Sequence, residues 1–113
     1  MSNFKNDLEK IIEATGITNI SKFPFNETES FRLISIDVLE LNARASNGLY
    51  RQNIKTLGNL IDNWERIPSL RGLGATSVKE IKRNFYEYYY STLSAKEVKR
   101  FWNRFVEMNY DAI

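Results

Sequence analysis

The segment that decides the fold is "LRGLGATSVKEI", residues 70–81, in which two glycines, one residue apart, precede a small polar cluster and an amphipathic run. Glycine accepts a positive φ and carries no side chain, so two short helices can meet through a tight turn built on such residues. The leucines before and between the glycines would anchor this turn in the core. The segment therefore predicts a helix-hairpin-helix; the alternative is an ordinary helical corner that the glycines merely close.

The start of the helix after this turn is a candidate anion site. The first backbone amides of a helix have no partner within it and lie at the positive end of its dipole. With a bare glycine in front of them, they can bind a nucleic-acid phosphate. Thr76 or Ser77 can add a hydroxyl donor, and Arg71 and Lys79 lie nearby in the sequence.

Arg44 is the second candidate contact, with Asn47 one turn later on the same helix face and Gly48 beside it. Glycine inside a helix costs about 1 kcal/mol relative to alanine, so a close approach at Gly48 would explain its presence. Arg44 could enter a minor groove, where narrow A·T-rich tracts concentrate negative potential. The alternative is a solvated arginine paired with Glu40, four residues earlier.

Helical spacing of apolar residues predicts an all-α fold, a compact bundle of about five short helices with helix-hairpin-helix elements. The first expected helix has an apolar stripe between Phe4 and Ile12. Ser2 or Asn3 can cap its start, and Gly16 can end it in the left-handed conformation.

The middle of the sequence is expected to be less regular before it becomes helical. Pro24 and a polar cluster predict a loop over residues 24–30, and alternating side chains over residues 31–36 predict a short extended piece. A short helix is then expected to stop at Asn53. Thr56 can cap the next helix, with Trp64 on its apolar face.

The last expected helix starts at "SAKE", Ser94–Glu97, which has the sequence of a capping box. Its apolar face includes Phe101, Trp102 and Phe105, and its opposite face carries Lys96, Lys99, Arg100 and Arg104. The basic face has two interpretations: the solvated back of a core-packed helix, or a second surface for a DNA backbone or a protein partner.

Composition and charge fit one soluble domain with room for a polyanionic partner. The protein has 113 residues, 42% of them hydrophobic, and no stretch of 18 apolar residues. The polar N-terminus does not fit a signal peptide, so we expect a cytoplasmic protein. Residues 1–40 carry four Lys or Arg against seven Asp or Glu, whereas residues 41–113 carry twelve against seven. The sequence has neither Cys nor His, and we expect no metal, no cofactor and no enzymatic activity.

Two longer stretches carry a resemblance to a known family. "IDVLELNARASNGLYRQNIKTLGNLIDN" followed by "IPSLRGLGATSVKEIKRNF" resembles the C-terminal domain of the bacterial RNA polymerase alpha subunit, over roughly residues 36–90. The family pattern is an Asp-Leu-Glu-Leu-type lead-in, Arg-Ser-x-Asn-Cys-Leu, a short second helix, and Asn-Leu-Gly-Lys-Lys-Ser-Leu-x-Glu-Ile. Its lead-in matches Val38–Leu41, and its later residues match Arg44, Asn47, Leu49, Leu73–Gly74, Ser77, Glu80 and Ile81.

This resemblance implies a helical bundle that binds A·T-rich double-stranded DNA upstream of promoters, through the minor groove and the backbone. It also implies contacts with RNA polymerase, the sigma subunit or transcription regulators. By position, the resemblance makes Arg44 the minor-groove arginine and places Asn47 and Gly48 beside phosphates. A further phosphate would be held by Gly74, Ser77 and the backbone of Thr76. Glu80 would orient this surface.

The sequence departs from the family pattern at the expected phosphate site. The two family lysines after the Leu-Gly pair are Ala75 and Thr76 here, and the family cysteine is Gly48. Each lost phosphate contact lowers affinity, although Arg71 and Lys79 can replace the lysines in part. We expect three parts: an N-terminal helix and loop extension over 1–35, the alpha C-terminal-like core over 36–90, and an amphipathic helix packed on it over 91–113.

The sequence thus favours a free-standing, non-enzymatic DNA-binding relative of transcription type. The alternative is a protein-interaction module on the same fold, in which DNA binding is weak or lost because both lysines are missing. A nuclease with a helix-hairpin-helix grip is disfavoured because the sequence has no histidine and no tight carboxylate cluster.

Overall fold

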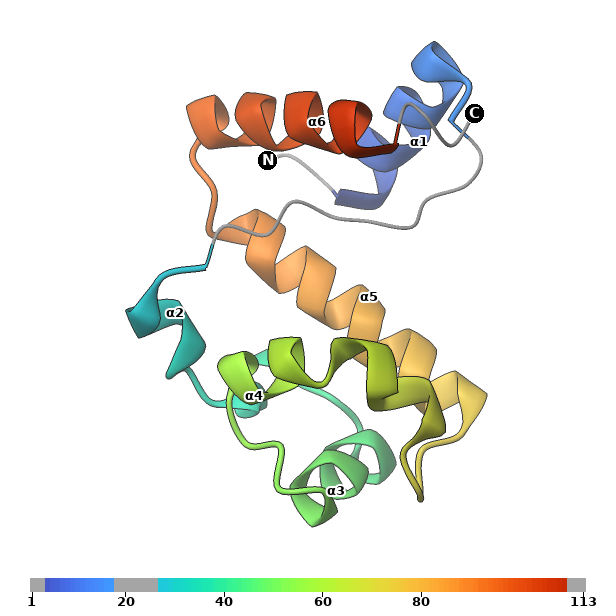
Figure 1. Ribbon diagram of the computed structural model, residues 1–113, viewed down its shortest axis with the longest axis vertical. Coiled ribbons are helices and arrows are strands. Elements are labelled where there is room, and N and C mark those ends of the chain that lie inside the picture. Colours follow the sequence, from blue (N-terminus) through green and yellow to red (C-terminus); the bar gives the residue numbers. More distant parts are fainter. Residues whose placement is uncertain (1–3, 18–26, 110–113) are drawn as a thin grey trace. The chain divides into compact units, whose positions relative to one another are not determined.

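The computed structural model describes residues 4–17 and 27–109, and these are helical almost throughout (Figure 1). The prediction of an all-α fold is confirmed. No β-strand forms among the described residues, where one isolated bridge pairs Ser35 with Thr56. The helices of that part are α1 (Phe4–Thr15), α2 (Glu29–Arg32), the 3₁₀ helix η1 (Ile36–Leu39), α3 (Ala43–Arg51), α4 (Leu57–Asp62), the 3₁₀ helix η2 (Trp64–Ser69), α5 (Ala75–Ser91) and α6 (Ala95–Asn109).

Most of the helix boundaries predicted from local sequence are confirmed. Gly16 follows α1 with a φ of 74°, and Asn53 lies just beyond α3 with a φ of 63°. Thr56 caps α4 in a capping box with Asn59, and Ser94 forms the expected reciprocal pair with Glu97 at the start of α6. The expected caps at Ser2 or Asn3 lie outside the described residues.

The extended piece predicted over residues 31–36 is wrong, and α2 also takes the last two positions of the loop predicted over 24–30. The hydroxyl oxygen of Thr28 accepts a hydrogen bond from the Phe31 amide and caps a helical turn. Ser35 then caps η1 by accepting from the Asp37 amide. An extended segment needs a ladder of partners, and here only the single bridge at Ser35 is available.

Two compact units divide the protein, one made of Glu27–Tyr88 and the other of Met1–Asn26 with Tyr89–Ile113. In the first unit the apolar sides of η1, α3, α4, η2 and α5 enclose a core. Its fully buried members include Ile36, Leu49, Leu57, Leu60, Ile67, Ile81 and Phe85. Trp64 begins η2 instead of extending α4, and its ring lies 5.0 Å from that of Phe85.

The second unit joins α1, the end of α5 and α6 through aromatic side chains. Phe4 stacks on Trp102 at 5.7 Å between ring centroids, and Phe101 packs edge-on against Trp102 at 4.9 Å. Tyr90 accepts a hydrogen bond from Trp102 Nε1 and donates one to Asp7, so its buried hydroxyl is satisfied. No helix among the described residues has both the length and the apolar character needed to cross a bilayer.

Candidate nucleic-acid interface

The glycine turn of the deciding segment leads directly into α5, as predicted. Leu70 and Leu73 are both buried and anchor the turn, and Gly72 adopts a φ of 89°. Gly74 does not have a positive φ, so of the two glycines only Gly72 uses the left-handed backbone that glycine permits. A Cβ at Gly74 would meet no atom within 4 Å. Its lack of a side chain therefore leaves the start of α5 open.

The N-terminus of α5 lacks the side-chain cap found on its neighbours. Side chains of Thr28, Asn42, Thr56 and Ser94 accept hydrogen bonds from the first turns of α2, α3, α4 and α6. Gly74, which precedes α5, has no such acceptor, and the first bond of the helix runs from the Val78 amide to the Gly74 carbonyl. The amides before Val78 are therefore available to an anion.

The start of α3 lies beside this helix end and is held there by Glu80 of α5. Asn42 caps α3 by accepting from the Ala45 amide at 2.9 Å. Glu80 accepts from the Asn42 backbone amide at 2.7 Å and from the Asn42 side-chain amide as well. The carboxylate thus fixes the cap of the helix that carries Arg44.

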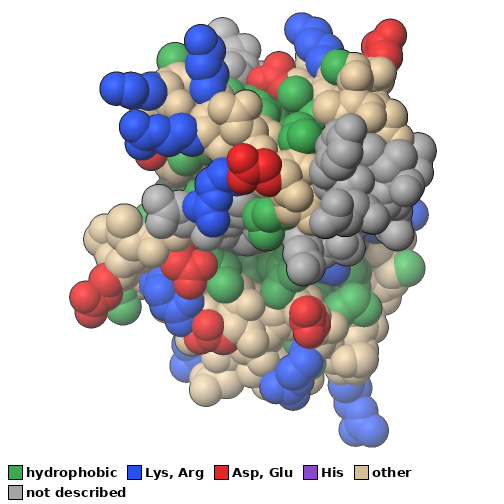
Figure 2. All heavy atoms as spheres, turned by 45° about the horizontal axis from the view of Figure 1, so that its top comes forward, with side chains coloured by type: hydrophobic (Ala, Val, Ile, Leu, Met, Phe, Trp, Pro, Cys, Tyr) green, Lys and Arg blue, Asp and Glu red, His purple; other side chains and the backbone are tan. Residues whose placement is uncertain are grey.

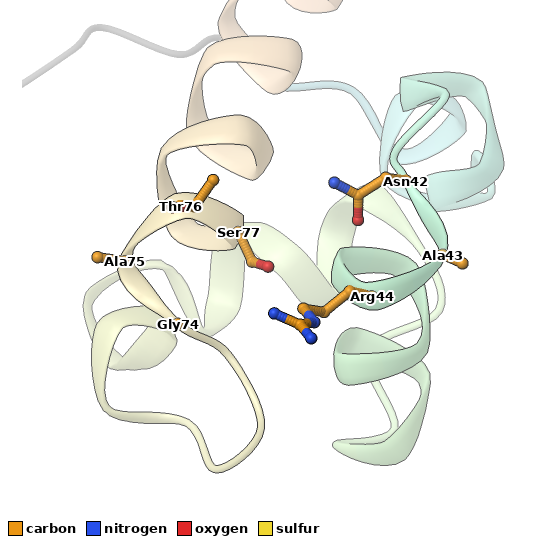
Figure 3. A pocket seen from close by; sticks show the side chains of 7 residues that line it. All are labelled: Asn42, Ala43, Arg44, Gly74, Ala75, Thr76 and Ser77. Carbon is orange, nitrogen blue, oxygen red and sulfur yellow. The ribbon is translucent and has the colours of Figure 1, made fainter.

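A pocket of about 420 Å³ opens between these two helix starts, lined by Asn42, Ala43, Arg44, Gly74, Ala75, Thr76 and Ser77. Figure 3 shows the guanidinium of Arg44 and the hydroxyl of Ser77 pointing toward one another across it, whereas the side chains of Ala75 and Thr76 point away. Of the two hydroxyl donors considered from the sequence, Ser77 is therefore the one directed into the pocket.

The hydroxyl of Ser77 and the guanidinium of Arg44 both remain available to a ligand. Ser77 is only 3% exposed, and its hydroxyl forms no hydrogen bond within the described residues. Arg44 is exposed and forms no ion pair in that part of the protein, so the alternative pairing with Glu40 is absent there. The unbonded hydroxyl of an otherwise buried serine and an exposed cation therefore face one pocket together with free helix amides, a donor set that suits an oxyanion such as phosphate.

The other residues predicted from the sequence do not line the pocket. Asn47 is exposed on α3, and Arg71 and Lys79 are exposed on the turn and on α5. Gly48 is buried, and a Cβ on it would lie 2.4 Å from Leu73 Cδ2. The close approach expected at Gly48 is thus made by the glycine turn itself, which α3 can meet only because position 48 has no side chain.

Asn42 is the polar residue of the pocket lining that the sequence analysis missed, along with the alanines Ala43 and Ala75. Its position before a helical run, with the capped amide three residues later, is a typical N-cap signal and could have located it. Its second partner could not be found in this way, since Glu80 lies 38 residues further along the sequence.

A comparison with protein families places this geometry in context. The family model for the C-terminal domain of the bacterial RNA polymerase alpha subunit matches residues 24–87, more than half of the protein. The protein belongs to this family. The resemblance noted over residues 36–90 is thereby confirmed, and the match begins early enough to include α2.

Individual relatives of the alpha C-terminal domain are subunits of DNA-directed RNA polymerase. The alpha subunit of Syntrophomonas wolfei is 49% identical over 55 residues, covering 48% of this protein and 17% of that subunit. The alpha subunit of Rubrobacter xylanophilus is 38% identical over 63 residues, 55% of this protein and 20% of its own length. The alpha subunit of Borrelia garinii is 35% identical over 71 residues, which cover 60% of this protein and 21% of that subunit. The protein thus spans about a fifth of the length of these relatives, and no solved structure matches it.

The pocket of this alpha C-terminal domain carries little positive charge. Arg44 is the only Lys or Arg among its lining residues, and the positions of the two family lysines, Ala75 and Thr76, are neutral. An anion bound here would be held chiefly by one guanidinium, the amides at the start of α5 and the Ser77 hydroxyl. Arg44 therefore dominates the electrostatics of the site.

Proposed function

We propose that this alpha C-terminal domain is a non-enzymatic DNA-binding module of transcription type. A phosphate of double-stranded DNA binds at the start of α5, on the amides after Gly74 and the hydroxyl of Ser77. Arg44 enters the adjacent minor groove, where A·T-rich sequence narrows the groove and concentrates negative potential. Asn47, Arg71 and Lys79 flank the contact, and Glu80 acts by holding Asn42.

One observation carries this proposal: the Arg44 guanidinium and the Ser77 hydroxyl face the same pocket at the uncapped start of α5 (Figure 3). Backbone amides and hydroxyls fix the register of a protein on the phosphates, whereas an arginine in the minor groove reads groove width. The two kinds of contact lie side by side here. RNA polymerase, the sigma subunit and transcription regulators are further proposed partners.

The test is a titration of the 113-residue protein with an A·T-rich and a G·C-rich duplex at about 50 mM and about 200 mM salt. We expect tighter binding to the A·T-rich duplex than to the G·C-rich duplex, and an affinity for both that falls as the salt concentration rises. Arg44→Ala should lower the affinity about tenfold or more and reduce the preference for A·T. Arg83→Ala, which removes an equal charge from an exposed position on α5, should change the affinity less than about twofold.

Equal affinities for the Arg44→Ala and Arg83→Ala variants would overturn this mode of binding. An NMR titration adds a second measurement, in which the amide signals of Gly74, Ala75 and Ser77 should shift with added duplex. The second candidate function, a protein-interaction module, is favoured by the neutral side chains at Ala75 and Thr76. It would be supported if the unmodified protein bound neither duplex at the lower salt concentration but retained purified RNA polymerase.

A further inference from the structure

The exposed face of α6 carries a row of cations that the proposed DNA site does not use. Its members, here called the α6 basic row, are Lys96, Lys99, Arg100 and Arg104, all exposed. Figure 2 shows Lys and Arg side chains gathered at its upper left, over the N-terminal part of α6. Lys96, Arg100 and Arg104 recur every four residues, with Lys99 next to Arg100, which places the row along one side of the helix.

The row is held by a rigid helix whose other face is fully occupied. Phe101, Trp102 and Phe105 are each less than a tenth exposed and pack in the aromatic cluster of the second unit. An amphipathic helix that inserts into a lipid surface needs an available apolar face, and in α6 that face is buried. The basic row is therefore suited to a ligand that is recognised by charge alone.

Carboxylates on the same helix neutralise this row only in part. The Glu97 carboxylate accepts the Ser94 amide in the capping box, although its charge also acts on Arg100. None of the four cations forms an ion pair with a carboxylate in the portion of the protein that the structure describes. Exposed cations without ion-pair partners are the groups that release counterions when a polyanion binds.

We propose that the α6 basic row is a second, sequence-independent contact with the phosphate backbone of duplex DNA. The proposal rests on the proposed function, which it extends to a surface outside residues 24–87, the part that matches the family. From Lys96 to Arg104 the row spans about 12 Å of helix. One strand of a duplex carries about four phosphates over that length.

The proposal also accounts for how a pocket with a single cation could hold DNA. Each phosphate neutralised by Lys or Arg contributes a slope of about 0.9 to the dependence of log affinity on log salt. Arg44 alone would give a shallow dependence. The α6 basic row adds up to four such contacts, and because it belongs to the same polypeptide, it raises the effective concentration of DNA at the pocket.

The experiment compares two double variants of equal charge in the 113-residue protein. Lys96→Gln with Arg100→Gln neutralises half of the row, and Lys5→Gln with Lys10→Gln neutralises two exposed lysines of α1. Affinity for an A·T-rich and a G·C-rich duplex is measured from about 50 to about 200 mM salt. For the α6 variant we expect about a tenfold loss with both duplexes and a salt slope lower by about 2, and for the α1 variant less than about a twofold change.

Circular dichroism checks that the variants are folded, and Lys99→Gln with Arg104→Gln replaces the first α6 variant if it is not. Equal affinities and slopes for the α6 and α1 variants would overturn the inference. The inference would also be overturned if the α6 variant lost binding to anionic lipid vesicles while its affinity for duplex DNA stayed unchanged. Arg44→Ala is included to separate the two proposals. If Arg44→Ala loses affinity for DNA and the α6 variant does not, only the α6 inference fails. If the α6 variant loses affinity and Arg44→Ala does not, the pocket proposal fails.

Discussion

At the scale of single residues, Glu80 shapes the interface although it does not line the pocket. Its carboxylate accepts hydrogen bonds from the backbone amide and the side-chain amide of Asn42, and Asn42 in turn caps the helix that carries Arg44. The direction of the guanidinium therefore depends on a negative charge, which would by itself repel DNA. This opposition between position and charge makes the role of Glu80 testable.

Glu80→Gln should weaken DNA binding several-fold, even though it makes the protein more positive. A neutral amide makes weaker hydrogen bonds to Asn42 than a carboxylate does, so the start of α3 becomes less ordered. Duplex affinity at two salt concentrations measures the effect. Glu87→Gln, at an exposed position on the same helix, supplies the matched control and should leave affinity equal or slightly higher. If Glu80→Gln bound DNA more tightly than the original protein, the charge of Glu80 would matter for binding and its hydrogen bonds to Asn42 would not.

Gly48→Ala should destabilise the fold by about 1 kcal/mol. Alanine gains about 1 kcal/mol of helix propensity, but a new Cβ 2.4 Å from Leu73 Cδ2 overpacks a buried contact, which costs typically about 1–3 kcal/mol. Urea unfolding followed by circular dichroism measures the change. Asn47→Ala, at the exposed neighbouring position of α3, should be neutral or stabilising. A Gly48→Ala variant as stable as Asn47→Ala would mean that Leu73 moves aside freely.

The sequence locates these residues but not all of their contacts. The spacing and the resemblance predict Arg44, Gly74 and Ser77 together, and they do line one pocket. The approach of Leu73 to Gly48 and the bond from Asn42 to Glu80 join positions far apart in the sequence, so no local pattern contains them. Both emerge only once α3 and α5 are packed.

At the scale of elements, the sequence predicts what is decided locally. Caps such as Thr56 and Ser94 depend on hydrogen bonds that span three residues, and both predictions are confirmed. The errors concern short segments whose state depends on neighbours. Residues 29–32 form a helix although a loop and an extended piece are predicted there, and Trp64 leaves the face of α4 to pack on Phe85.

The cap of α6 should give the second unit a stability that is lost in acid. The Ser94 amide and hydroxyl, which hydrogen-bond to the Glu97 carboxylate, hold its pKa below the ordinary 4.5. Because the folded pKa is depressed, the stabilisation is present above pH 4.5 and disappears as the pH falls through the folded value. Glu97→Gln should thus be less stable than the original protein near neutral pH and equal to it in strong acid.

Urea unfolding at a series of pH values measures this convergence. Glu107→Gln, which removes an equal charge from an exposed position on the same helix, is the matched control. A constant offset between Glu97→Gln and the original protein across that range would mean that the carboxylate is not what caps α6.

At the scale of the whole molecule, the domain matched by the family and the surrounding helices contribute different things. Residues 24–87 supply the fold and the pocket, whereas α6, outside the match, supplies more cations than the pocket itself contains. The sequence shows that the C-terminal two-thirds is the basic part. It cannot show which of these cations lack ion-pair partners, because that depends on where the carboxylates of other elements lie in the fold.

The stability of the whole protein should fall steeply in alkali because of one half-buried phenol. Burial raises the pKa of Tyr86 from 10.0 to about 12. Between these values the unfolded state loses the proton of Tyr86 while the folded state keeps it, so unfolding is favoured increasingly as the pH rises through this window.

Tyr86→Phe removes the ionisable group, and its urea midpoint should fall less between pH 10 and about 12 than that of the original protein. Tyr88→Phe, two residues further along α5, is the matched control. If Tyr86→Phe and Tyr88→Phe gave equal slopes, the alkaline transition would have to arise elsewhere in the molecule.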